Sequence, residues 1–230
     1  MNRDVDRRQF LHSAVAGALV GVTARTATAP RAARRPTAHS SPMSPVTALR
    51  ALIDGNRRFA ANRLTSIEHD LAVLKAHTAE KQAPFAAVLA CADSRVPVEL
   101  VFDQTIGQLF VARVAGNIVT PEIIASLEYG VAVLGVSALL VLGHTNCGAV
   151  KAAMKADEVP GQISALYLPL RTAVERSGGD VTKAIETNAR VQADLLRTSS
   201  TVIRDAVKAG RLEVVAGVYD LATGNVALSS

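Results

Sequence analysis

Two short apolar runs constrain the fold of this chain more than any other feature of its sequence. Residues 85–90 read Phe-Ala-Ala-Val-Leu-Ala and residues 138–142 read Ala-Leu-Leu-Val-Leu, with no polar side chain in either run. Runs this short and this apolar are typical of strands buried on both faces, as in a parallel sheet. Residues 109–114 predict a third strand. Stretches of helical periodicity separate the runs, so we expect an α/β fold with a mostly parallel central sheet flanked by helices.

Helical spacing and turn residues predict the remaining elements. Residues 47–64 form an amphipathic pattern that we expect to be interrupted at Gly55-Asn56, and Pro121 with Glu122 is typical of a first helical turn. Helices are predicted over residues 47–64, 67–81, 121–134, 148–156, 181–200 and 202–208, a last strand over 212–219, and a short edge strand after the turn at 222–225.

The excess positive charge of the chain lies in its first 42 residues. The whole sequence has 25 Lys and Arg against 20 Asp and Glu, a net charge of +5. Residues 1–42 hold seven Arg and two Asp, which leaves 18 basic and 18 acidic residues in the rest. A nucleic-acid-binding protein needs a basic patch on its folded part. We therefore predict no nucleic-acid partner.

The N-terminus has the layout of an export signal. Arg7-Arg8 precedes a short apolar run of small residues over 13–22. This order is typical of a secretory signal, and the paired arginines favour the twin-arginine route to the periplasm or another extracytoplasmic compartment. About ten apolar residues are too few to span ~30 Å of hydrocarbon as a helix, so we predict no stable membrane span. The chain is predicted to divide into an export signal, a flexible linker and a single catalytic domain, at residues 1–29, 30–44 and 45–230.

Both cysteines of the chain and one histidine fall where predicted strands end. Cys91 follows the first apolar run, His144 follows the second, and Cys147 comes three residues later at a predicted helix start. In open parallel sheets, sites form outside the carboxyl ends of the strands. Two thiolates and an imidazole suit Zn²⁺, and three protein ligands leave the open position of a catalytic site. The alternatives are a disulfide or two unrelated buried thiols.

Two charged residues follow the first of these candidate ligands. Asp93 lies two residues after Cys91, and Arg95 two residues further on. An aspartate at this spacing can reach the metal or its bound water, and an arginine can hold the carboxylate by a bidentate pair and lower its pKa. A surface ion pair is the alternative interpretation.

These residues lie within two segments that closely resemble the signature motifs of β-class carbonic anhydrases. The segments are Cys91-Ala-Asp-Ser-Arg-Val96 and Gly143-His-Thr-Asn-Cys-Gly-Ala-Val150, and the similarity extends over nearly all of residues 45–228. The resemblance implies the β-carbonic anhydrase fold, with N-terminal helices that pack on a partner subunit in a homodimer or tetramer.

The resemblance also implies roles for individual residues. It makes Cys91, His144 and Cys147 the ligands of one zinc ion per subunit. Asp93 and Arg95 match a dyad in which Asp93 either orients the zinc-bound water or, in a closed state, becomes the fourth ligand. The residues that match substrate-binding positions are Gln82, Phe110, Tyr129 and Gly148.

The reaction implied is reversible hydration of carbon dioxide to bicarbonate and a proton, by a zinc-bound hydroxide. Gln82 is typical of the open, plant-like subgroup, and Val88 stands where the closed subgroup carries Trp, so we expect the open state. Two alternatives remain: hydrolysis of carbon disulfide or carbonyl sulfide on the same scaffold, and a non-catalytic homologue that binds zinc or bicarbonate.

Overall fold

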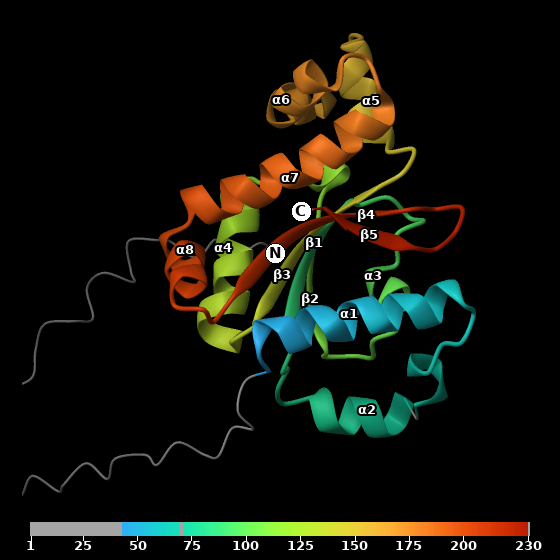
Figure 1. Ribbon diagram of the computed structural model, residues 1–230, viewed down its shortest axis with the longest axis vertical. Helices are drawn as coiled ribbons and strands as arrows, with labels where there is room; N and C mark the ends of the chain where they lie inside the picture. The colour runs from blue at the N-terminus through green and yellow to red at the C-terminus, as the bar shows by residue number, and fades with distance from the viewer. Residues whose placement is uncertain (1–42, 70, 230) are drawn as a thin grey trace, which may run out of the picture. The chain divides into compact units, whose positions relative to one another are not determined.

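A computed structural model describes residues 43–69 and 71–229, and these form a five-stranded sheet flanked by helices (Figure 1). The predicted signal and most of the predicted linker lie outside the described residues. In spatial order the strands are β2 (Leu109–Arg113), β1 (Ala86–Ala90), β3 (Ala138–His144), β4 (Glu213–Tyr219) and β5 (Val226–Ser229). The first four run parallel, and β5 is antiparallel to β4. The predicted fold class is confirmed.

The register of the sheet brings the carboxyl ends of its central strands together. Ala90 at the end of β1 pairs with Arg113 of β2 and with Leu142 of β3. Every residue of β1 and β3 is buried. Both faces of these strands are therefore covered, which explains why their sequences are apolar without alternation.

One face of the sheet packs against α4 (Pro121–Tyr129), α7 (Val181–Ser199) and α8 (Thr201–Lys208). The opposite face packs against α1 (Pro45–Ala60) and the short α3 (Val98–Val101). Alternate residues of the strands supply the two cores: Leu89, Leu139 and Val141 face the first set of helices, and Val88, Leu140 and Leu142 face the second.

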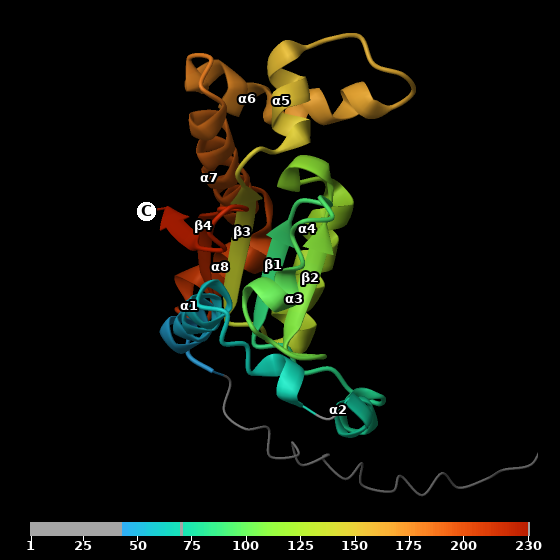
Figure 2. The same ribbon diagram turned by 90° about the vertical axis from the view of Figure 1, so that its right-hand side faces the viewer.

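The other helices lie at the two ends of the strands (Figure 2). Beyond the carboxyl ends are α5 (Gly148–Lys155) and α6 (Tyr167–Ser177), and toward the amino ends lies α2 (Leu71–Thr78). Single turns complete the chain at η2 (Ser66–Glu68), η3 (Ala115–Asn117), η4 (Gly130–Leu134) and η5 (Ile163–Leu166).

The predicted interruption of the first helix is wrong, because α1 runs unbroken through Gly55 and Asn56. A Cβ on Gly55 would stand 1.8 Å from the carbonyl oxygen of Phe102, so the glycine serves close packing. The Asn56 side chain donates to the carbonyls of Val101 and Gly224, at 3.1 and 2.8 Å. Both residues tie the helix to distant segments rather than end it.

The second helix is shorter than the predicted 67–81, and α6 was not predicted. The chain before α2 forms a turn that Asp103 stabilises, because its carboxylate accepts hydrogen bonds from the backbone N–H groups of Thr65 and Ser66. Pro169 near the start of α6 obscures its helical pattern in the sequence. Across residues 43–69 and 71–229, no helix has the length and apolar character that crossing a bilayer requires.

Candidate metal centre

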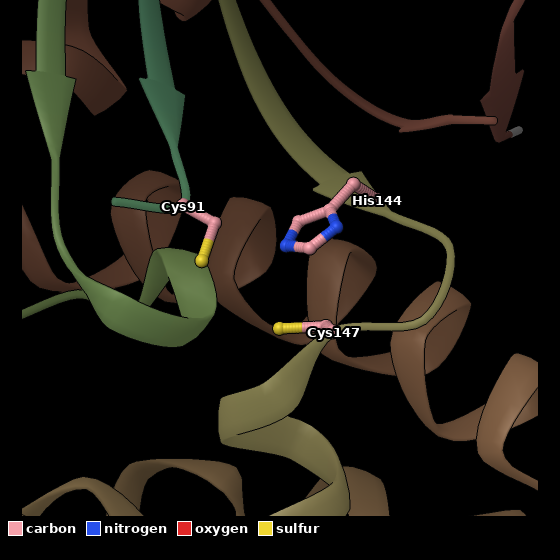
Figure 3. A group of neighbouring side chains, drawn as sticks. All are labelled: Cys91, His144 and Cys147. Atoms are coloured by element: carbon pink, nitrogen blue, oxygen red, sulfur yellow. The ribbon is translucent and has the colours of Figure 1, made fainter. Parts of the chain in front are cut away.

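Three elements carry the predicted ligands to one point at the carboxyl edge of the sheet (Figure 3). Cys91 follows β1, His144 is the last residue of β3, and Cys147 is the N-cap residue of α5. Because β1 and β3 pair side by side, their ends are neighbours. The ligand atoms of all three side chains lie within 4.8 Å of one another, and all three residues are buried. In Figure 3 both sulfurs and the imidazole ring converge on a common space.

A tight turn returns Cys147 to the end of β3. Asn146 adopts a left-handed conformation, with φ at 60°, which asparagine tolerates better than most residues. The turn is anchored because Thr145 donates its backbone N–H to the carbonyl of Tyr219 at 2.9 Å. The sequence His-Thr-Asn-Cys thus folds so that a ligand on a strand and a ligand on a helix face each other.

His144 is prepared as a ligand through its Nε2 atom. Its Nδ1 lies 2.9 Å from the carbonyl oxygen of Thr145, and since a carbonyl only accepts, Nδ1 carries the proton. In the neutral imidazole, Nε2 then has the free lone pair. This atom is buried without a hydrogen-bond partner. A buried acceptor left unpaired is costly, and a metal ion among the ligands would satisfy it.

The two sulfurs have different hydrogen-bond surroundings. The Cys147 thiol and the Gly116 N–H donate hydrogen bonds to the Cys91 sulfur and lower its pKa. The pKa of Cys147 is raised, because it donates to that thiolate and is itself buried. Backbone N–H groups at the start of α5 act in the opposite direction on Cys147. Both cysteines are free rather than joined in a disulfide.

The donor set fits zinc. Two sulfurs and one imidazole nitrogen are borderline-soft donors, and their close convergence matches a single ion. The set therefore holds one zinc ion per subunit, with a fourth position left by the protein ligands. Three protein ligands with an open position define a zinc centre of the catalytic kind.

Asp93 lies beside the ligand set and is held by Arg95. The guanidinium donates from Nε to Oδ1 at 2.9 Å and from Nη2 to Oδ2 at 2.8 Å, and the backbone N–H of Arg95 adds a bond of 3.0 Å. This pairing holds the pKa of the Asp93 carboxyl well below its usual range. Oδ2 is 3.8 Å from Nε2 of His144. In this arrangement Asp93 is engaged by Arg95, and its role as a fourth ligand stays a prediction.

Two residues near the centre were assigned no role from the sequence. Arg113, at the end of β2, donates from Nε to the carbonyl of Cys91 at 2.9 Å and from Nη2 to the carbonyl of Asp93 at 2.5 Å. Gly116 places its N–H 3.3 Å from the Cys91 sulfur. Arg113 falls within the predicted third strand and Gly116 two residues beyond it, and neither position indicates these bonds.

The predicted substrate residues are divided between the two ends of the sheet. Gly148 is the first residue of α5, next to a ligand, and it is exposed. Gln82 precedes β1, and Phe110 lies near the start of β2, opposite Ala87 of β1. Tyr129 ends α4, and its ring centroid is 6.2 Å from that of Phe110. Within one subunit, these last three residues are therefore at the end of the strands remote from the ligands.

Comparison with known proteins agrees with this geometry. The family model described as "Carbonic anhydrase" matches residues 86–226. A carbonic anhydrase of Mycolicibacterium smegmatis is 37% identical over 201 residues, which cover 81% of this chain and 94% of that protein.

Solved structures of β-carbonic anhydrases share the fold, and two of them serve as examples. A β-carbonic anhydrase of Aspergillus fumigatus superposes with a TM-score of 0.65 at 27% identity, covering 79% of this chain and 90% of the other. A β-carbonic anhydrase of Sordaria macrospora, described as tetrameric, superposes with a TM-score of 0.62 at 28% identity, covering 68% and 90%. The chain belongs to the β-class carbonic anhydrase family.

Proposed function

We propose that this chain catalyses the reversible hydration of carbon dioxide to bicarbonate and a proton at the centre formed by Cys91, His144 and Cys147. The observation that carries the proposal is the buried, unpartnered Nε2 of His144, which faces two sulfurs with the Asp93–Arg95 pair beside them. The membership of the carbonic anhydrase family supports it.

The metal and the protein have separable tasks in this reaction. Zinc, when bound, supplies a Lewis acid that lowers the pKa of a coordinated water toward ~7. The Asp93 carboxylate stays ionised because Arg95 donates two hydrogen bonds to it, so it acts only as an acceptor. Oδ2 is therefore placed to accept a hydrogen bond from a group held among the ligands and to fix the orientation of that group. The N–H of Gly148, an exposed residue at a helix start, suits an anionic product.

One experiment distinguishes carbon dioxide hydration from two alternatives, hydrolysis of carbonyl sulfide or carbon disulfide and binding without catalysis. Carbon dioxide, carbonyl sulfide and carbon disulfide are offered in parallel to the zinc-replete protein, with a pH indicator and a sulfide assay. We expect proton release from carbon dioxide well above the buffer rate. Sulfide release without carbon dioxide hydration would identify a hydrolase, and no turnover of any substrate would identify a binding protein.

A second subunit is part of the proposal, because one subunit does not complete the substrate pocket. The outer edge of β2 pairs with no other strand of residues 43–69 and 71–229. Two such edges pairing antiparallel about a two-fold axis would put the start of one β2 beside the end of the other. Gln82, Phe110 and Tyr129 of the partner subunit would then approach this subunit's zinc ligands.

The surface beside β2 supports such a contact. A groove of about 520 Å³ lies next to this edge, remote from the zinc ligands, and its lining includes Leu71, Leu100, Ile106 and Leu109. We infer that a second copy of the chain covers it, with the N-terminal helices taking part. Pairing of such dimers into a tetramer is the further assembly state that the relatives suggest.

Export by the twin-arginine route completes the proposal, supported by Arg7-Arg8 and the apolar run behind them. The full chain and a variant with both arginines changed to Lys are expressed in a bacterium with an active twin-arginine translocase. We expect the full chain in the periplasm and the variant in the cytoplasm. An equal distribution of the two would contradict this route.

A further inference from the structure

The backbone beside Cys91 is held in an unusual conformation. Gly116 has φ at 74° and Asn117 has φ at 43°, both in the left-handed region, within the single turn η3. The conformation points the Gly116 N–H at the Cys91 sulfur, 3.3 Å away. A non-glycine residue with positive φ is uncommon and persists only where the surroundings enforce it.

Two amide side chains on α7, Asn188 and Gln192, hold the η3 turn by hydrogen bonds. Asn188 donates from Nδ2 to the carbonyl of Gly116 at 2.8 Å, so that residue is held on both its N–H and its C=O side. Gln192 donates to Oδ1 of Asn188 at 3.0 Å, which fixes the orientation of that amide. Gln192 also accepts the Val119 N–H at 2.8 Å, just past the turn.

Both amide side chains are buried, and each of their nitrogen and oxygen atoms has a hydrogen-bond partner. Asn188 and Gln192 are each 1% exposed, and Gln192 has a further bond to the carbonyl of Pro169 at 3.1 Å. The other buried positions of α7 are mostly apolar, among them Ile185, Ala189 and Leu196. Polar groups are expensive to bury, and these two are directed at the backbone that touches a metal ligand.

We propose that Asn188 and Gln192 are positioning residues of the metal centre, which hold the Gly116 N–H on the Cys91 sulfur. The inference rests on the proposed zinc site. A hydrogen bond to a ligating sulfur withdraws charge from it and restricts its position, as outer partners of metal ligands do. Through Gly116, the amide pair on α7 thus affects how strongly the Cys91 sulfur donates to a bound metal.

The test uses the Co²⁺-substituted full-length protein, in which thiolate-to-metal charge-transfer absorption reports on the sulfurs directly. Asn188→Ala should free the turn and remove the hydrogen bond to Cys91, which raises the energy of the sulfur lone pairs. We expect the charge-transfer band to move to longer wavelength. Zinc affinity, measured by competition with a chromophoric chelator, should fall about 10–100-fold.

Two further variants separate positioning from loss of stability. Leu196→Ala truncates a fully buried side chain on the same helix, packed against the sheet away from Gly116. It should lower the melting temperature and leave both the band and the zinc affinity unchanged. Gln192→Met keeps the side-chain length but removes the amide, and should shift the band in the same direction as Asn188→Ala, by less.

The outcomes separate the positioning role of the amide pair from the zinc site itself. An unchanged band and unchanged affinity in Asn188→Ala would overturn the positioning role, as would equal shifts in Asn188→Ala and Leu196→Ala. If Asn188→Ala does not fold, the result for Gln192→Met decides by the same criteria. A wild-type protein that binds Co²⁺ without any charge-transfer band would instead contradict the thiolate ligands, and with them the proposed function.

Discussion

Oδ2 of Asp93 lies 3.8 Å from Nε2 of His144, while both oxygens of that carboxylate accept hydrogen bonds from Arg95. The distance to Nε2 places the Asp93 carboxylate next to the zinc ligands. The hydrogen bonds from Arg95 keep the carboxylate ionised and fix its orientation. A group bound among the ligands would therefore meet an acceptor whose position is fixed by the protein rather than by the metal.

Asp93→Asn tests this relationship. The amide keeps the size of the side chain but loses the charge and half of the acceptor capacity. Zinc content should stay at one ion per subunit, while carbon dioxide hydration falls at least ~100-fold. Metal analysis and stopped-flow kinetics on the same sample give both quantities. Unchanged turnover would show that the carboxylate has no part in the reaction.

Cys147→Ser tests the ligand assignment itself. A serine hydroxyl is a poor zinc ligand at neutral pH, and only two strong donors remain. Zinc affinity should fall more than ~100-fold, beyond the range seen for outer partners of ligands. Ser164→Ala, on an exposed part of η5, is the control and should keep its zinc. Full zinc retention by the Cys147 variant would remove that residue from the centre.

Acid stability should depend on Asp103, which is buried away from the centre. Burial acts to raise its pKa, but hydrogen bonds from Ser66, Arg58 and Thr65 outweigh it, and the pKa is lowered overall. A carboxyl with a depressed pKa in the folded state stabilises the fold above its unfolded pKa. That contribution is lost progressively as the pH falls below about 4.

Asp103→Asn should therefore unfold more easily at pH 7, by about 1–3 kcal/mol, since the backbone donors lose their charged acceptor. Its urea midpoint should also fall less steeply than that of the wild type below pH 4. Asp54→Asn removes a half-exposed partner of Arg57 and should change little at either pH. Parallel acid profiles for the wild type and the Asp103 variant would contradict the account.

Gly55→Ala sets two physical effects against each other. Helix propensity alone predicts that alanine stabilises α1 by about 1 kcal/mol. The structure predicts the opposite sign, because the new methyl group would collide with the Phe102 carbonyl. We expect a lower melting temperature, measured by circular dichroism. A stabilised variant would show that α1 does not pack against α3 this closely.

Mixing two defective proteins tests whether Gln82 acts across the subunit interface. Gln82→Ala and Cys147→Ser are each expected to be impaired as homodimers. In a mixed dimer, the zinc site of the Gln82 variant would receive an intact Gln82 from the other chain. Random re-pairing should then restore about a quarter of the sites, because half the dimers are mixed and each has one complete site. No gain on mixing would place Gln82 in its own subunit's site.

The sheet and the ligands were predictable because their signals are local. Apolar runs mark strands buried on both faces, and the carboxyl ends of parallel strands meet, which brought Cys91 and His144 together in the prediction. The unbroken course of α1 was not predictable, since the role of Gly55 depends on a carbonyl far along the chain. The bonds from Arg113 to the Cys91 loop depend on strand register in the same way.

Restoration of activity by zinc tests the central claim most directly. The protein is stripped of metal under reducing conditions, zinc is added back in steps, and carbon dioxide hydration is followed by stopped flow with a pH indicator. The account predicts that the rate rises linearly and reaches its plateau at one zinc ion per subunit. A zinc-replete protein that hydrates carbon dioxide no faster than buffer would contradict it.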